Sequence, residues 1–75
     1  MSRTIDIDAV WDDEAAVWTA TSPDLPGLVA EASTWAVLIE EVRALVPDLM
    51  ELAGQVHADL TLRFRAETRI DVDAA

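Results

Sequence analysis

The sequence contains no cysteine and no lysine. Without cysteine, neither a disulfide nor a thiolate zinc site can stabilise the fold, and a cysteine nucleophile is excluded. The basic residues are five arginines against fifteen Asp and Glu, which gives a formal net charge of −10. Proteins that bind DNA or RNA usually neutralise the phosphates with Lys and Arg, so direct nucleic-acid binding is not expected. A basic protein partner is electrostatically favoured.

Long apolar runs are also absent. No stretch approaches the ~20 apolar residues of a membrane span, and the first residues, MSRTIDIDAVW, contain no apolar signal core. These features predict a cytoplasmic protein without a membrane segment. The only two glycines, Gly27 and Gly54, lie too far apart to form a phosphate-cradling loop.

The 75 residues predict one small domain, and 52% of them are hydrophobic, which is enough for a core. A domain of this size buries only about 60% of the surface of its unfolded chain, so its stability is marginal. Small domains often gain stability by associating. We therefore expect a homo-oligomer, either a dimer or a tetramer.

Two alternating segments predict a β-hairpin. Residues 3–11 and 16–22 alternate apolar and polar side chains, and residues 12–14 form an acidic turn between them. A turn centred on residues 13 and 14 gives a register in which each large side chain meets a small one. The expected pairs are Trp11 with Ala16, Ala9 with Trp18, and Ile7 with Ala20. Asp6 and Asp8 should lie on the opposite, solvent-facing side.

The next segment combines prolines with a glycine. In residues 22–27, Pro23 and Pro26 fix φ and Gly27 permits positive φ, which predicts an ordered turn. This turn is a candidate binding loop, because ordered loops often carry function; it is equally a candidate connector. Residues 28–31 then form a short third strand.

A helix follows the third strand. Ser33 or Thr34 is its cap, and Gly54 ends it. Its apolar positions recur at three- and four-residue spacing, and they are Trp35, Leu38, Ile39, Val42, Leu45, Val46, Leu49, Leu52 and Ala53. Pro47 should either kink this helix or begin a second short one.

Residues 56–65 alternate again and predict a fourth strand, which completes a domain over residues 1–66. Residues 67–75 form a C-terminal tail that could extend this strand. The element order predicts a two-layer α+β fold, β-β-β-α-β, with one helix packed on a four-stranded sheet. A parallel pairing of the first and fourth strands would set Arg63 and Arg65 beside the two aspartates of the first strand.

Catalytic arrangements are weak in this sequence. A two-metal nuclease needs several convergent carboxylates, but Asp6 and Asp8 are expected to pair with arginines, and Glu40 and Glu41 should lie on the solvent side of the helix. His57, the only histidine, is interpreted as a surface residue. We therefore expect no enzyme activity, no catalytic residue, no metal and no cofactor.

Six segments of the sequence carry a resemblance to a known family. They are Trp11-Asp12-Asp13-Glu14-Ala15, Val17-Trp18-Thr19-Ala20-Thr21-Ser22, Asp24-Leu25-Pro26-Gly27-Leu28-Val29, Glu31-Ala32, Leu38-Ile39-Glu40-Glu41 and Val46-Pro47-Asp48-Leu49. These segments resemble the HicB-like antitoxin family, and they are most similar to its short branch, a HicB-related domain of unknown function without a DNA-binding domain. The resemblance implies a partly degraded ribonuclease-H-like sheet with one helix, self-association, and neutralisation of a small basic HicA-type toxin that cleaves RNA. Longer HicB proteins add a C-terminal DNA-binding domain, whereas this sequence ends ten residues after the fourth strand, so operator binding is not expected.

The sequence therefore predicts a non-enzymatic protein-binding module, an antitoxin of a toxin–antitoxin system. Its expected partner-binding residues form the turn Pro23, Asp24, Leu25, Pro26 and Gly27. Two alternatives remain open. One is a structural homo-oligomer that binds a small ligand between subunits, and the other is a remnant ribonuclease-H-like nuclease.

Overall fold

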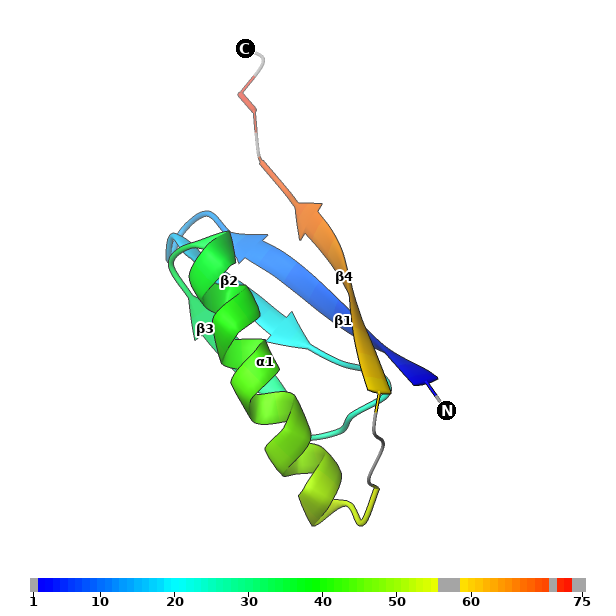
Figure 1. Cartoon of the computed structure of the whole chain (residues 1–75). Helices are drawn as coiled ribbons and strands as arrows, with labels where there is room; N and C mark the ends of the chain where they lie inside the picture. Colours follow the sequence, from blue (N-terminus) through cyan, green and yellow to red (C-terminus); the bar gives the residue numbers. More distant parts are fainter. Residues whose placement is uncertain (1, 56–58, 71, 74–75) are drawn as a thin grey trace.

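The computed structural model describes residues 2–55, 59–70 and 72–73, and these form two layers (Figure 1). The elements are β1 (Ser2–Asp12), β2 (Val17–Thr21), β3 (Val29–Ala32), α1 (Trp35–Leu52) and β4 (Asp59–Thr68). The sheet has the order β3-β2-β1-β4, and β4 runs parallel to β1 whereas the other pairs are antiparallel. The predicted α+β architecture, with one helix on a four-stranded sheet, is confirmed.

The β1–β2 register differs by two residues from the predicted one. Trp11 pairs with Trp18, and Ala9 pairs with Ala20, so the expected pairs of a large with a small residue are wrong. The two indole rings pack against each other with centroids 5.4 Å apart, and such aromatic contact is itself stabilising. Because the shift is an even number of residues, each side chain stays on its predicted face.

The physical reason for the shift lies in the turn. Asp12 Oδ1 accepts hydrogen bonds from the backbone N–H groups of Glu14 and Ala15 at 3.1 and 3.2 Å. An aspartate that holds the backbone two and three residues ahead favours a wider turn. Ala16 closes this turn with a φ of 57°. The loop therefore spans residues 13–16 instead of the two central residues that the prediction assumed.

Helix α1 begins and ends near the predicted residues. Thr34 is the N-cap, and its Oγ1 accepts from the backbone N–H of Val37 at 3.2 Å. Gly54 has a φ of 72° and donates its N–H to the Glu51 carbonyl, so the predicted glycine stop is confirmed. The helix runs without a break through Pro47, which excludes the predicted alternative of a second short helix.

The core lies between α1 and the inner face of the sheet. Its buried residues are Ile5, Ile7, Ala9, Ala20, Leu25, Leu28, Ala30, Ala32, Leu38, Val42, Val46 and Met50. The last two apolar positions of the predicted helical pattern do not reach the core, since Leu52 is 84% exposed and Ala53 is also exposed. Met50 is buried in their place, because it continues the four-residue spacing from Val46.

Strand β4 lies at one edge of the sheet, away from the helix. Helix α1 crosses β2 and β3, so the inner side chains of β4 are only half-buried. The strand continues three residues beyond the predicted end at residue 65, while the predicted start at residues 56–58 lies outside the described residues. In the described part of the chain, no helix is long and apolar enough to cross a membrane.

Candidate partner-binding surface

An open apolar groove of about 400 Å³ lies between α1 and β4. The helix contributes Ile39, Arg43, Val46 and Pro47, and the strand contributes Leu60, Leu62 and Phe64. The groove exists because α1 is centred over β2 and β3 while β4 extends the sheet beyond it. Apolar concave surfaces of this kind are common sites of ligand and protein binding. None of the partner-binding residues predicted from the sequence lines this groove.

Aromatic packing fixes the Phe64 end of the groove. The ring of Phe64 meets Trp35 of α1 edge-to-face at a centroid distance of 5.7 Å. Trp35 in turn packs edge-to-face on Trp18 at 4.9 Å, and Trp18 contacts Trp11. Edge-to-face contacts are a favoured geometry for aromatic pairs. This row of four rings joins β1, β2, α1 and β4, and so it holds the groove wall in place.

The groove also contains polar groups on its helical wall. Arg43 is the one charged residue of the lining, and its guanidinium pairs with Glu40 at 3.2 Å on the exposed surface. Pro47 has no N–H, so the Arg43 carbonyl receives no helical hydrogen bond from it. Arg43 therefore places one cation, paired with Glu40, beside an otherwise apolar lining.

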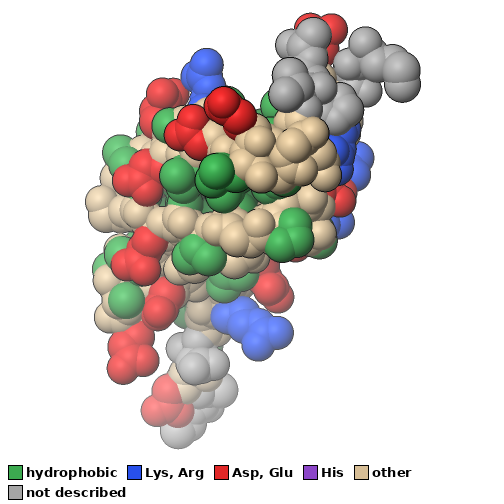
Figure 2. All heavy atoms as spheres, turned by 90° about the horizontal axis from the view of Figure 1, so that it is seen from below, with side chains coloured by type: hydrophobic (Ala, Val, Ile, Leu, Met, Phe, Trp, Pro, Cys, Tyr) green, Lys and Arg blue, Asp and Glu red, His purple; other side chains and the backbone are tan. Residues whose placement is uncertain are grey.

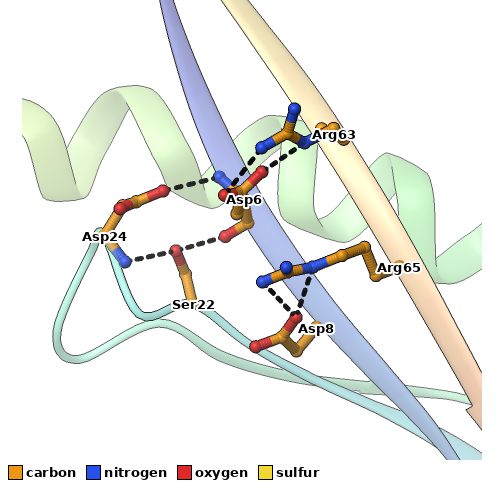
Figure 3. A network of polar contacts seen from close by, with 6 residues as sticks. All are labelled: Asp6, Asp8, Ser22, Asp24, Arg63 and Arg65. Atoms are coloured by element: carbon orange, nitrogen blue, oxygen red, sulfur yellow. Dashed lines mark hydrogen bonds and ion pairs between the residues drawn. The ribbon is translucent and has the colours of Figure 1, made fainter.

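The predicted binding loop has a structural role at the edge of β1. Strand β2 pairs with β1 only from Asp8 onward, so the backbone of Asp6 faces the loop instead of a strand. Ser22 Oγ donates to the Asp6 carbonyl at 2.6 Å, and Asp24 Oδ2 accepts from the Asp6 N–H at 2.8 Å (Figure 3). The loop thus supplies the hydrogen bonds that a longer β2 would have made.

The five predicted loop residues are divided between core and surface. Leu25 is buried, and its carbonyl accepts from the Leu28 N–H at 3.2 Å. Pro23, Asp24, Pro26 and Gly27 are exposed, and Gly27 takes a φ of 94°. Leu25 is therefore a core residue, and partner contact by the four exposed residues stays a prediction.

The carboxylates of β1 face the arginines of β4, as the sequence predicted. Arg63 donates from Nε and Nη2 to both oxygens of Asp6 at 2.6 and 3.0 Å, and Arg65 pairs with Asp8 at 3.0 Å (Figure 3). The hydrogen bond from Arg63 holds the pKa of Asp6 below its usual range. Among the described residues, no group of three or more His, Asp or Glu side chains is placed to hold a metal ion.

The arrangement defines a small α+β domain with a surface groove between its helix and its edge strand. The chain belongs to the family described as Domain of unknown function (DUF1902), which it matches over residues 4–73. It is also similar to the crystal structure of hypothetical protein TTHA1013 from the extremely thermophilic bacterium Thermus thermophilus. That similarity has 38% identity and a TM-score of 0.80, and it covers 93% of this chain and 100% of that chain. A search among curated proteins finds no match.

Proposed function

We propose that this chain is a cytoplasmic, non-enzymatic module that binds a basic protein through the groove between α1 and β4. The observation that carries the proposal is the open apolar lining, which includes Leu60, Leu62 and Phe64, on a chain of net charge −10. Apolar anchors in a desolvated groove supply most of the affinity of a protein interface. The surrounding negative charge favours a basic partner and speeds its association.

The distribution of charge supports a basic partner. Helix α1, which forms one groove wall, exposes the acidic residues Glu40, Glu41, Asp48 and Glu51. In Figure 2, acidic side chains gather mainly along the left side of the view with hydrophobic side chains near them, while basic side chains lie at the top, at the right edge and in the lower middle. A partner that carries Lys and Arg around an apolar segment would complement both properties of this surface.

Within this proposal, the partner is a small basic HicA-type toxin that cleaves RNA, and the chain is its HicB-like antitoxin. Support comes from the segments that resemble HicB proteins, since they cover the β1–β2 hairpin, the ordered loop, β3 and α1. The four-stranded sheet with a parallel β4 and one helix also suits the partly degraded ribonuclease-H-like fold that the resemblance implies. By covering the RNA-binding surface of the toxin, the acidic chain would stop cleavage.

Co-expression with a small basic HicA-type toxin tests the proposal. The intact chain should relieve the growth arrest that the toxin causes, whereas Ile39→Arg should not, because it replaces an apolar contact and adds a second cation beside Arg43 in the groove that a basic partner must fill. Val37→Arg is the matched control, since Val37 lies on the same helix, is 47% exposed and does not line the groove. Growth arrest that persists with the intact chain would contradict the proposal, as would equal rescue by both variants.

A further inference from the structure

Strand β4 presents a long unpaired edge. It is ten residues long and ends the sheet, and no strand among the described residues pairs with the side that faces away from β1. The opposite edge of the sheet, β3, is only four residues long. A long edge strand offers a row of free N–H and C=O groups to another strand. Native proteins cover or pair such edges, and nothing in the described chain covers this one.

We propose that the occupant of this edge is β4 of a second copy of the chain. The two strands run antiparallel, and a two-fold axis perpendicular to the sheet passes between Leu62 and its counterpart. Such an axis keeps both helices on the same side of one continuous sheet, so inward side chains meet inward ones across the interface. This inference concerns the edge of β4 and goes beyond the proposed function, although the second copy would also lie against Leu60, Leu62 and Phe64, which form the strand side of the groove.

In this antiparallel register, the side chains of β4 complement those of β4 in the second copy. On the inner face, Leu60 lies opposite Phe64 of the second copy, and Leu62 meets Leu62. These side chains are half-buried in the single chain, so pairing covers apolar surface. On the outer face, Asp59 lies opposite Arg65, once on each side of the axis. Opposite charges placed directly across two antiparallel strands stabilise the pairing.

The charged groups of this register are available. Asp59 is exposed and makes no ion pair with another described residue. Arg65 uses Nε and Nη2 for Asp8, and its side chain is still 57% exposed, so its Nη1 can reach a second carboxylate. Arg63, which faces Thr61 in the second copy, is already neutralised by Asp6.

Neighbouring registers fit less well. Centring the pairing on Arg63 sets that arginine against its own copy and Asp59 against Glu67. Centring it on Phe64 sets Arg63 against Arg65 on both sides of the axis, and like charges directly opposite each other are destabilising. Centring it on Thr61 avoids these conflicts but shortens the ladder within β4 from residues 59–65 to residues 59–63.

Sedimentation equilibrium with complementary charge variants tests the interface. The intact chain at about 100 μM, well above the micromolar dissociation constants of weak dimers, should have twice the chain mass of 8.2 kDa. Asp59→Arg and Arg65→Glu each create like charges twice across the axis, so each should weaken dimerisation about tenfold. An equimolar mixture of the two variants restores both opposite-charge pairs and should recover a dimer close to the parent affinity. Asp48→Arg, on the exposed side of α1, changes the charge equally and should leave the dimer unchanged.

Cross-linking fixes the register. The chain has no cysteine, so Leu62→Cys introduces one thiol that meets its own copy on the axis and should form an intermolecular disulfide under mild oxidation. Val10→Cys, on the exposed outer face of β1, is the control and should stay monomeric under denaturing, non-reducing conditions. A monomeric parent chain would overturn the proposal. So would a dimer that Asp59→Arg leaves intact and that Leu62→Cys does not cross-link, since another surface would then form it.

Discussion

Asp6 and Arg63 face each other across the parallel strands β1 and β4, and the guanidinium binds both carboxylate oxygens, at 2.6 and 3.0 Å. The backbone of the same aspartate is held from the other side, because Ser22 Oγ binds its carbonyl and Asp24 binds its N–H. Asp6 thus connects the edge strand β4, strand β1 and the loop after β2. Asp6 should therefore contribute both to the stability of the fold and to the dependence of that stability on pH.

The stability of the fold should depend on pH through Asp6. The hydrogen bond from Arg63 lowers the pKa of Asp6 in the folded state, so the unfolded chain binds more protons at this carboxyl. The stabilisation is therefore fully present above the unfolded-state pKa of about 3.9 and is lost as the pH falls through the lower folded-state pKa. Asp6→Asn should be less stable than the parent at neutral pH, and this difference should shrink below pH ~4.

Urea unfolding of both proteins at several pH values measures this difference. Asp48→Asn, which removes an exposed carboxylate of α1, controls for the loss of one negative charge. If the gap between the parent and Asp6→Asn stayed constant from neutral to acidic pH, folding would not lower the pKa of Asp6.

The carboxylates of β1 should not support nuclease activity. With magnesium or manganese, the chain should not cleave RNA, because Asp6 and Asp8 each hold an arginine and a two-metal reaction needs several convergent carboxylates. A fluorogenic RNA assay over a range of metal concentrations provides the measurement. Metal-dependent cleavage that disappears in Asp6→Asn would instead support a remnant ribonuclease-H-like nuclease.

The loop after β2 should stabilise the fold through its hydrogen bonds to Asp6. Asp24→Ala removes the acceptor for the Asp6 N–H, and we expect it to lower the free energy of unfolding by about 1 kcal/mol, a typical net value for one hydrogen bond. Pro26→Ala, at an exposed position of the same loop, should change stability less. Chemical denaturation compares the two, and an unchanged Asp24→Ala variant would show that the loop does not hold the edge of β1.

The row of four aromatic rings should contribute a large part of the stability of the fold. Trp18 packs on Trp11 and Trp35 with centroids 5.4 and 4.9 Å away. Trp18→Ala removes both contacts and should destabilise the fold by about 3 kcal/mol, a large part of the stability of a small domain. Thr19→Ala, on the outer face of the same strand, should cost much less. Thermal melts within a few degrees of each other would show that the indole adds little to the fold.

Charge and periodicity made most of the fold predictable. The alternation of Arg63 and Arg65 matched that of Asp6 and Asp8, so the parallel pairing of β1 with β4 could be inferred from the sequence alone. The hairpin register could not, because it depends on the Asp12 side chain capturing two backbone N–H groups and on the left-handed conformation of Ala16. Such local turn chemistry outweighed the expected match of large with small residues.

The groove was harder to predict, because it depends on where the helix crosses the sheet. The alternating pattern assigns the inner face of the strand to Leu60, Leu62 and Phe64. It does not indicate that α1 leaves these side chains half-buried. Pro47, whose missing N–H predicts a kink or a break in the helix, is also part of the groove wall. The structure divides the five predicted loop residues: Leu25 belongs to the core, and the other four are exposed.

Isothermal titration of a purified HicA-type toxin, made inactive in RNA cleavage, into this chain and its groove variants measures whether the groove binds such a partner. We expect binding that weakens as salt screens the charges. Ile39→Arg should lose affinity by at least about tenfold, from lost apolar contact and added repulsion, with Val37→Arg close to the parent. Absence of binding to the intact folded chain, or equal affinity of the two variants, would contradict the proposed function.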